Sequence, residues 1–326
     1  MNAVLSRMSL HGQKPSSGDI CVSLHPKTPP LRVITMWTDE EMTPRQKYGS
    51  LTMPKTVDDN LAIDLNVLIV EPAEEYHAQA GEYLSSHQLL DFMACPWLYR
   101  KKQLGLIPDG DTPALLLGRA THTRILEGRD AYELQFALGG PINPKTNKPF
   151  GSTTKAFAEW AKVQGKPVLS HDNVELIEKM ASGVGMNDEA VDLLLYGRSE
   201  GVIRTVYCDT PCQIRLDWLH PHRGLVDLKT TADLTWFEND AKRRRYHNQL
   251  AFYQAVLAQV IDQYVPVYLI AVEKAEPFRC GVWLISDNTL AIARQENEEA
   301  IRRLRRAWEI DAFPTGYEVI RILDFP

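Results

Sequence analysis

The sequence predicts an α/β domain that fills most of the chain, and three observations support this fold class. Apolar residues recur at helical spacing between about residues 85 and 197. After Gly197, short segments rich in β-branched and aromatic residues indicate strands. Helical patterns then return at residues 244–261 and 290–309. We therefore expect one large domain that contains both helices and strands.

Composition limits the classes of protein to consider. The 326 residues are 44% hydrophobic and 24% charged, which is typical of a soluble globular protein. Because the formal net charge is −6, any contact with nucleic acid must use local basic patches. No apolar run approaches the roughly 20 residues of a membrane-spanning helix, and the N-terminus lacks the pattern of a signal peptide. We expect a cytoplasmic protein without a membrane partner.

Residues 1–70 differ in composition from the rest of the chain. They are rich in Pro, Ser, Thr and Lys and contain only brief apolar runs. We expect a poorly ordered N-terminal arm there and a folded domain over residues 71–326.

The first half of this domain is predicted to be helical. Ser85 or Ser86 caps a helix that Pro96 kinks or restarts, and a further helix runs from Pro113 to Gly128. A surface loop at residues 139–151 precedes helical segments at residues 153–165 and 170–197.

The strands follow. Residues 199–209, 212–220 and 224–231 are predicted to form a three-stranded meander whose turns are Thr-Pro and Pro-His-Arg-Gly. After the helix at 244–261, two more strands are expected at residues 266–274 and 279–286.

The last strand of the meander carries two opposite charges. Asp227 and Lys229 lie two residues apart and so share a face, while Leu228 points into a core. If the second turn is centred on His222, Asp217 lies directly opposite Asp227. Facing carboxylates need a shared proton or a cation between them, and Mg²⁺ with oxygen ligands meets that need.

A simple salt bridge between Asp227 and Lys229 on a solvated strand is the ordinary interpretation of this spacing. Asp217 across the turn, the apolar strand and a histidine upstream favour a metal site instead. That histidine, His122, lies on one helical face with Gly118, whose missing side chain leaves room for it to meet another element. A hydrogen-bonded core histidine is the alternative.

The cysteines give little support for a metal centre of their own. They are odd in number and scattered, and the tight late group that holds an iron–sulfur cluster in some nucleases is missing. We expect ordinary packed thiols and no iron–sulfur cluster. The cysteines are Cys21, Cys95, Cys208, Cys212 and Cys280.

Four ordered blocks after residue 75 carry a family resemblance: "LGRATHTRILEG", "IRLDWL", "VDLKTTAD" and "RYHNQLAFY". Together they resemble the PD-(D/E)XK nuclease superfamily and, within it, the phage-type exonuclease VIII (RecE-like) group. The resemblance implies a restriction-endonuclease-like α/β core, in which helices flank a central mixed β-sheet.

The resemblance also implies roles for individual residues. His122 matches a metal-site histidine, Asp217 the first metal-binding aspartate, and Asp227 and Lys229 the D-x-K element. The main-chain carbonyl of Leu228 is an extra ligand by the same resemblance. Gln249 and Tyr253 match the glutamine and tyrosine of the helix that flanks the site in RecB-like nucleases. Glu200 matches the glutamate at the start of the preceding strand. An ordinary helix surface packed on the sheet remains the alternative for Gln249 and Tyr253.

The function that the resemblance implies is hydrolysis of linear double-stranded DNA from 5′ to 3′ with Mg²⁺, for which Mn²⁺ substitutes. The product is a 3′ single strand for an annealing recombinase of the RecT type. A homo-oligomeric ring around DNA, in a bacterial or phage-infected cell, belongs to the same expectation. Basic clusters at residues 241–247 and 302–308 offer contacts for DNA phosphates, although either can be a solvated helix face.

Two alternatives stay open. One is a nuclease of the same fold that acts on single-stranded or branched DNA, as RecB-like and Cas4-like nucleases do. The other is a non-catalytic DNA-binding or assembly protein.

Overall fold

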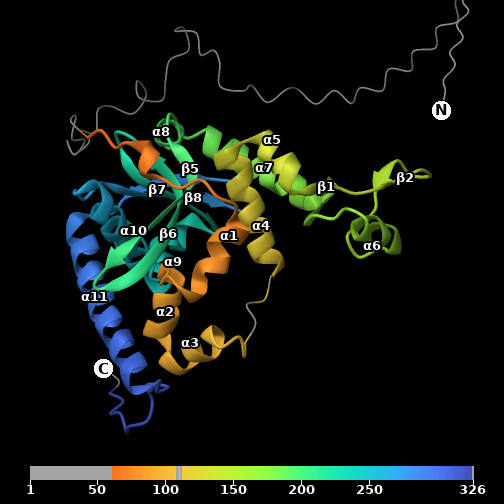
Figure 1. Cartoon of the computed structure of the whole chain (residues 1–326). Helices are drawn as coiled ribbons and strands as arrows, with labels where there is room; N and C mark the ends of the chain where they lie inside the picture. The colour runs from red at the N-terminus through yellow and green to blue at the C-terminus, as the bar shows by residue number, and fades with distance from the viewer. Residues whose placement is uncertain (1–60, 108–109, 111, 325–326) are drawn as a thin grey trace, which may run out of the picture. The chain divides into compact units, whose positions relative to one another are not determined.

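A five-stranded mixed β-sheet forms the centre of the described chain (Figure 1). The computed structural model describes residues 61–107, 110 and 112–324. In pairing order the strands are β5 (Arg198–Tyr207), β6 (Thr210–His220), β7 (Gly224–Thr231), β8 (Val267–Glu273) and β9 (Cys280–Leu284). Neighbouring strands are antiparallel except β7 and β8, which are parallel because helices cross over between them. The predicted mixed sheet is confirmed.

Helices cover both faces of this sheet (Figure 1). On one face, α2 (Ser86–Ala94), α10 (Tyr246–Ile261) and α11 (Asp287–Ile310) supply apolar side chains to the larger core cluster. On the other, α4 (Pro113–His122), α7 (His171–Gly185) and α8 (Asp188–Leu193) contribute to a second cluster. Every residue of β8 is buried, as expected for a strand with helices on both sides.

Side-chain caps begin many of the helices at the places that the sequence indicates. The Ser85 side chain accepts from the N–H of Gln88 in a capping box, and Thr112 caps α4. Pro96 starts a new helix, α3, as predicted. The remaining helices are α1 (Ala73–Ala78), α3 (Pro96–Gln103), α5 (Arg129–Gln135), α6 (Lys155–Lys162) and α9 (Phe237–Arg243), with 3₁₀ turns at Leu65–Val67, Gln79–Gly81 and Leu234–Trp236.

The predicted helix that ends at Gly128 changes its winding before it stops. It is α-helical to His122 and π-helical over Thr123–Glu127, and Gly128 then adopts a φ of +92°. Single π-helical turns are frequent at functional sites. No helix among the described residues is long and apolar enough to span a membrane.

Three boundaries differ from the sequence prediction. The predicted boundary between arm and domain at residue 70 is too far along the chain, because Leu61, Ile63 and Leu68 are buried in the larger core cluster. Residues 1–60 of that arm lie outside the described residues. The first turn of the meander is Cys208–Asp209, with φ of +50° and +52°, and not Thr-Pro, because paired positive φ angles suit the twist of a two-residue hairpin.

The third difference concerns the expected loop at residues 139–151. It contains a short hairpin of β2 (Ile142–Asn143) and β3 (Lys148–Pro149). Just before it, β1 (Ala137–Gly139) pairs in parallel with β4 (Val168–Ser170). Strands of two or three residues are too short to produce a periodic signal in the sequence.

Candidate metal centre and active site

The site begins where β6 and β7 separate. The pairs Trp218↔Val226 and His220↔Gly224 confirm a turn centred on His222. Asp217 and Asp227 are next in this register, but the ladder ends before them. The main-chain N–H of Leu228 instead donates to Oδ2 of Asp217 at 2.9 Å. The carboxylate of Asp217 therefore fixes the point at which the two strands part.

Glu200 on β5 extends this acidic row to a third strand. The pairs Ser199↔Trp218 and Gly201↔Leu216 set Glu200 across from Asp217. Glu200 has a φ of +54°, a left-handed conformation that costs a residue with a side chain about 1 kcal/mol or more. Strain of this kind concentrates at functional sites, which makes Glu200 a stronger candidate than its sequence alone suggested.

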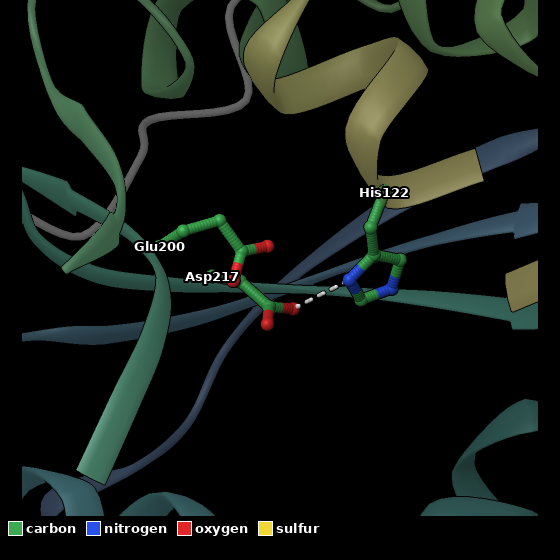
Figure 2. A group of neighbouring side chains, drawn as sticks. All are labelled: His122, Glu200 and Asp217. Atoms are coloured by element: carbon green, nitrogen blue, oxygen red, sulfur yellow. Dashed lines mark ion pairs between the residues drawn. The ribbon is translucent and has the colours of Figure 1, made fainter. Parts of the chain in front are cut away.

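His122 approaches the row from the end of α4. Its Nδ1 lies 3.5 Å from Oδ2 of Asp217, and ligand atoms of His122, Glu200 and Asp217 all lie within 4.8 Å of one another (Figure 2). These side chains remain 23%, 18% and 17% exposed, so water and substrate can reach the group. The predicted role of Gly118 is wrong, since a Cβ there would meet nothing within 4 Å. His122 reaches the sheet without close packing at that glycine.

Asp227 and Lys229 form the deeper part of the site. Nζ of Lys229 lies 2.5 Å from Oδ2 of Asp227, whose side chain is only 3% exposed. Neither carboxylate oxygen of Asp227 accepts a hydrogen bond of good geometry from the described residues. Lys229 also lies 5.0 Å from the centroid of the Tyr246 ring. Asp227 is thus a buried acceptor with a single ionic partner, adjacent to the more open group but not a member of it.

Burial and neighbouring charges shift the pKa values at this site. Burial raises the pKa of Asp227, Lys229 partly opposes the rise, and Asp217 adds to it. Burial and the nearby Asp217 likewise raise the pKa of Glu200. Burial tends to lower the pKa of Lys229, but the carboxylates of Asp227 and Asp217 outweigh it and raise that pKa.

The pKa of His122 is lowered, which is the direction that metal ligation requires. Burial lowers the pKa of His122, although Asp217 and a hydrogen bond with the Leu228 backbone oppose the change. The neutral imidazole that results has a lone pair for a metal ion.

The residues present fit a divalent cation. The three carboxylates of the site, Glu200, Asp217 and Asp227, outnumber its two cationic side chains, which are those of Lys229 and Arg215. Both carboxylate oxygens of Asp227 also lack hydrogen bonds of good geometry from the described residues. Carboxylate oxygens suit Mg²⁺ and Mn²⁺, and the imidazole of His122 suits Mn²⁺ as well. Arg215 pairs with Glu200, and its Nε lies 3.0 Å from Oε2 of that carboxylate. Sequence reasoning missed Arg215, although it lies two residues before Asp217 on the same strand face.

Gln249 and Tyr253 lie on α10 below the site. Nε2 of Gln249 donates to the Tyr253 hydroxyl at 3.0 Å, and each residue is 6% exposed. Burial raises the pKa of Tyr253, and the carboxylate of Asp227 raises it further. Their expected catalytic role stays a prediction.

The two basic clusters have different surroundings. Tyr246 of the 241–247 cluster is the ring beside Lys229, so this cluster adjoins the site. In the 302–308 cluster most guanidinium groups pair with acids. These pairs are Arg302–Glu299, Arg305–Asp209 and Arg306–Glu309. These three arginines therefore have local ionic partners.

The described cysteines are all free thiols. Cys212 is buried and the others are partly buried, and burial raises the pKa of both Cys212 and Cys280 to about 12. Cys21 lies outside the described residues. These thiols are consistent with ordinary packing.

Comparisons with known proteins bear on the family and the fold of this chain. The profile of a family described as "PDDEXK-like domain of unknown function (DUF3799)" matches residues 85–324. The chain belongs to this family. The resemblance to the PD-(D/E)XK nuclease superfamily, and the restriction-endonuclease-like fold that it implied, are thereby confirmed.

Among solved structures, this PDDEXK-like chain is similar to a protein from Eubacterium rectale described as "Putative exonuclease". The TM-score is 0.59 and the sequences are 19% identical over 79% of this chain and 96% of that chain. This similarity supports the fold. A search of curated proteins found no match.

Proposed function

We propose that this protein is a metal-dependent deoxyribonuclease. The observation that carries the proposal is the solvent-accessible group of His122, Glu200 and Asp217 beside the buried Asp227–Lys229 pair, in a PDDEXK-like fold. Phosphodiester hydrolysis requires positive charge at the phosphate and an oriented water. The site offers groups for both tasks.

His122, Glu200 and Asp217 would hold Mg²⁺ or Mn²⁺, with Asp227 and the carbonyl of Leu228 as further ligands. The bound ion would polarise the phosphate and lower the pKa of a water molecule. Lys229 orients the attacking water and stabilises negative charge that develops on the phosphate. Asp227 holds the ammonium of Lys229 in place at 2.5 Å. Arg215 fixes the carboxylate of Glu200.

Gln249 and Tyr253 act as positioning residues in this proposal. Because both are almost fully buried, they contact neighbouring side chains and not the substrate. Their hydrogen bond holds the Tyr253 hydroxyl in place within the core beside α10.

We further propose linear double-stranded DNA as the substrate, degraded from 5′ to 3′ to leave a 3′ single strand. The supporting observations are the resemblance to RecE-like exonucleases and the exposed basic residues of the 241–247 cluster beside Lys229. An annealing recombinase would take up the single strand. A homo-oligomeric ring around the duplex would keep the enzyme on its substrate.

The test is release of nucleotides from linear duplexes labelled at the 5′ or the 3′ end, with Mg²⁺, by the parent and by Lys229→Ala. We expect early release of the 5′ label by the parent and a rate at least about 10²-fold lower for the variant. A single-stranded substrate is the companion sample. Preference for that substrate would replace the duplex proposal, and no release from any substrate would contradict the nuclease proposal.

A further inference from the structure

The outer edge of β9 presents unpaired backbone groups. The N–H of Glu273 donates to the carbonyl of Arg279, and the N–H of Ile285 donates to the carbonyl of Val267. The backbone N–H and C=O groups of odd-numbered residues in β9 therefore point toward β8, and those of Val282 and Leu284 point away from it. Within the described residues only one outward group of β9 has a partner, the carbonyl of Cys280, which accepts from the Asn187 side chain at 2.9 Å.

Such an edge is a template for another strand. β9 consists of apolar residues and glycine, its side chains are partly buried, and Leu284 is 41% exposed. Charged residues and proline, which commonly protect free edges from pairing, are missing from it.

A second feature of the same chain has the complementary chemistry. The segment Val319–Leu323, "VIRIL", is rich in β-branched residues, and Ile320 and Ile322 are 101% and 89% exposed. β-Branched residues favour strands, and exposed apolar side chains that share one face of a strand, as Ile320 and Ile322 would, mark an interaction site. This segment lacks an apolar surface of its own chain to cover it in the described structure.

Chain length argues against pairing of these two features within one molecule. The 24-residue α11 follows β9 and runs for about 36 Å toward α2 and α3 (Figure 1). The chain is held there, because the carbonyl of Pro314 accepts from the N–H of Trp97 and Phe313 stacks on Tyr99. From Pro314 to Arg321 an extended chain reaches at most about 25 Å.

We propose that Val319–Leu323 of one molecule adds as a sixth strand to the β9 edge of a second copy of this chain. Main-chain hydrogen bonds to Val282 and Leu284 provide the pairing, and Ile320 and Ile322 bury their side chains against the partner. The contact joins two different surfaces, so repetition closes a ring when the rotation between copies allows it. The inference rests on the proposed homo-oligomer and not on catalysis.

The test is the solution mass of the full-length protein and its variants by light scattering. Val282→Pro removes an outward N–H without breaking the β8 ladder, and Val282→Ala is its matched control. Ile320→Asp with Ile322→Asp removes the apolar contact, and Ile320→Val with Ile322→Val is the control. We expect a multiple of the 37.0 kDa chain for the parent and both controls, and single chains for both disrupted proteins.

Mixing the two disrupted proteins makes the test specific. One keeps the edge and the other keeps the segment, so the mixture should form a complex of two chains that neither protein forms alone. A monomeric parent, unchanged mass in either disrupted protein, or no complex on mixing would overturn the inference. Coverage of the edge by residues 1–60 or by the molecule's own C-terminal segment would give one of these results.

Cleavage of a short linear duplex with Mg²⁺, measured on the same samples, keeps the two proposals apart. A parent of multimeric mass that cleaves no DNA would contradict the nuclease proposal and leave the assembly standing. A monomeric parent that cleaves DNA would contradict only the assembly.

Discussion

Glu200 combines two unfavourable features in one residue. Its backbone adopts a φ of +54°, and its carboxylate lies close to that of Asp217. Arg215 offsets part of the repulsion, at 3.0 Å from the Glu200 carboxylate. A purely structural residue at this position would be glycine, which adopts the left-handed conformation without strain. A glutamate in this strained backbone conformation is consistent with a ligand role.

Two variants separate backbone strain from ligation at this position. Glu200→Gly and Glu200→Ala both delete the carboxylate, but only glycine relieves the positive φ. We expect Glu200→Gly to be more stable than Glu200→Ala by about 1 kcal/mol in urea unfolding, with weakened Mn²⁺ binding in both. Equal stabilities would show that Glu200 is unstrained, and unchanged Mn²⁺ affinity would remove it from the metal site.

At the scale of elements, a buried carboxylate joins the end of β8 to the 3₁₀ turn Leu234–Trp236. Glu273 is 4% exposed, and it accepts from the Leu234 N–H at 2.8 Å and from the Arg279 guanidinium at 2.6 Å. The hydrogen bonds from Arg279 lower the pKa of Glu273 to about 2. This contact fixes the segment that leads from β7 toward α9 and α10.

Glu273 should contribute to the acid sensitivity of the protein. Because its pKa is lowered on folding, its stabilisation is present above the unfolded pKa of 4.5 and is lost as pH falls toward about 2. Glu273→Gln should lower the free energy of unfolding by about 1–3 kcal/mol at pH 7, and the difference from the parent should narrow by pH 3. Thermal unfolding at both pH values is the measurement. A gap that stays constant with pH would contradict the assignment.

The relation between sequence and structure differs from element to element. Equal distance from the turn at His222 suffices to predict the pairs Trp218↔Val226 and His220↔Gly224, because hairpin pairing follows from chain geometry alone. Asp217 and Asp227 come next in this register, but the strands part before them. The positive φ of Glu200 and the π-helical turn after His122 depend on tertiary contacts, so residue type and periodicity do not reveal them. Packing of Leu61 and Leu68 was missed for a related reason, since a short apolar segment within a polar region lacks a periodic signal.

For the whole molecule, the acidic net charge and the proposed DNA substrate are compatible because positive charge is local. Lys242 and Arg244 of the 241–247 cluster are exposed, and among the described residues they form no ion pair. Arg302 and Arg306 of the second cluster pair with glutamates at 2.8 and 3.1 Å. Charge without a local partner is available to phosphates.

This difference predicts which cluster contributes to DNA binding. Lys242→Ala with Arg244→Ala should weaken duplex binding and reduce the slope of log affinity against log salt by about 1–2. The matched control, Arg302→Ala with Arg306→Ala, should change the slope by less than half as much. Fluorescence anisotropy of a labelled duplex over a range of salt concentrations is the measurement. A larger change of slope in the control would contradict this prediction and indicate that α11 contacts the DNA phosphates instead.

We propose that the acidic row of Glu200 on β5 and Asp217 on β6 holds the metal ion of a nuclease. The most direct test of this proposal is cleavage of linear duplex DNA against Mg²⁺ concentration by the parent and by Asp217→Asn, whose amide oxygen can still accept the Leu228 N–H bond. We expect Mg²⁺-dependent cleavage by the parent and at least about a 10²-fold lower rate for a folded Asp217→Asn. Equal cleavage by both proteins, or cleavage that needs no divalent ion, would contradict the proposal.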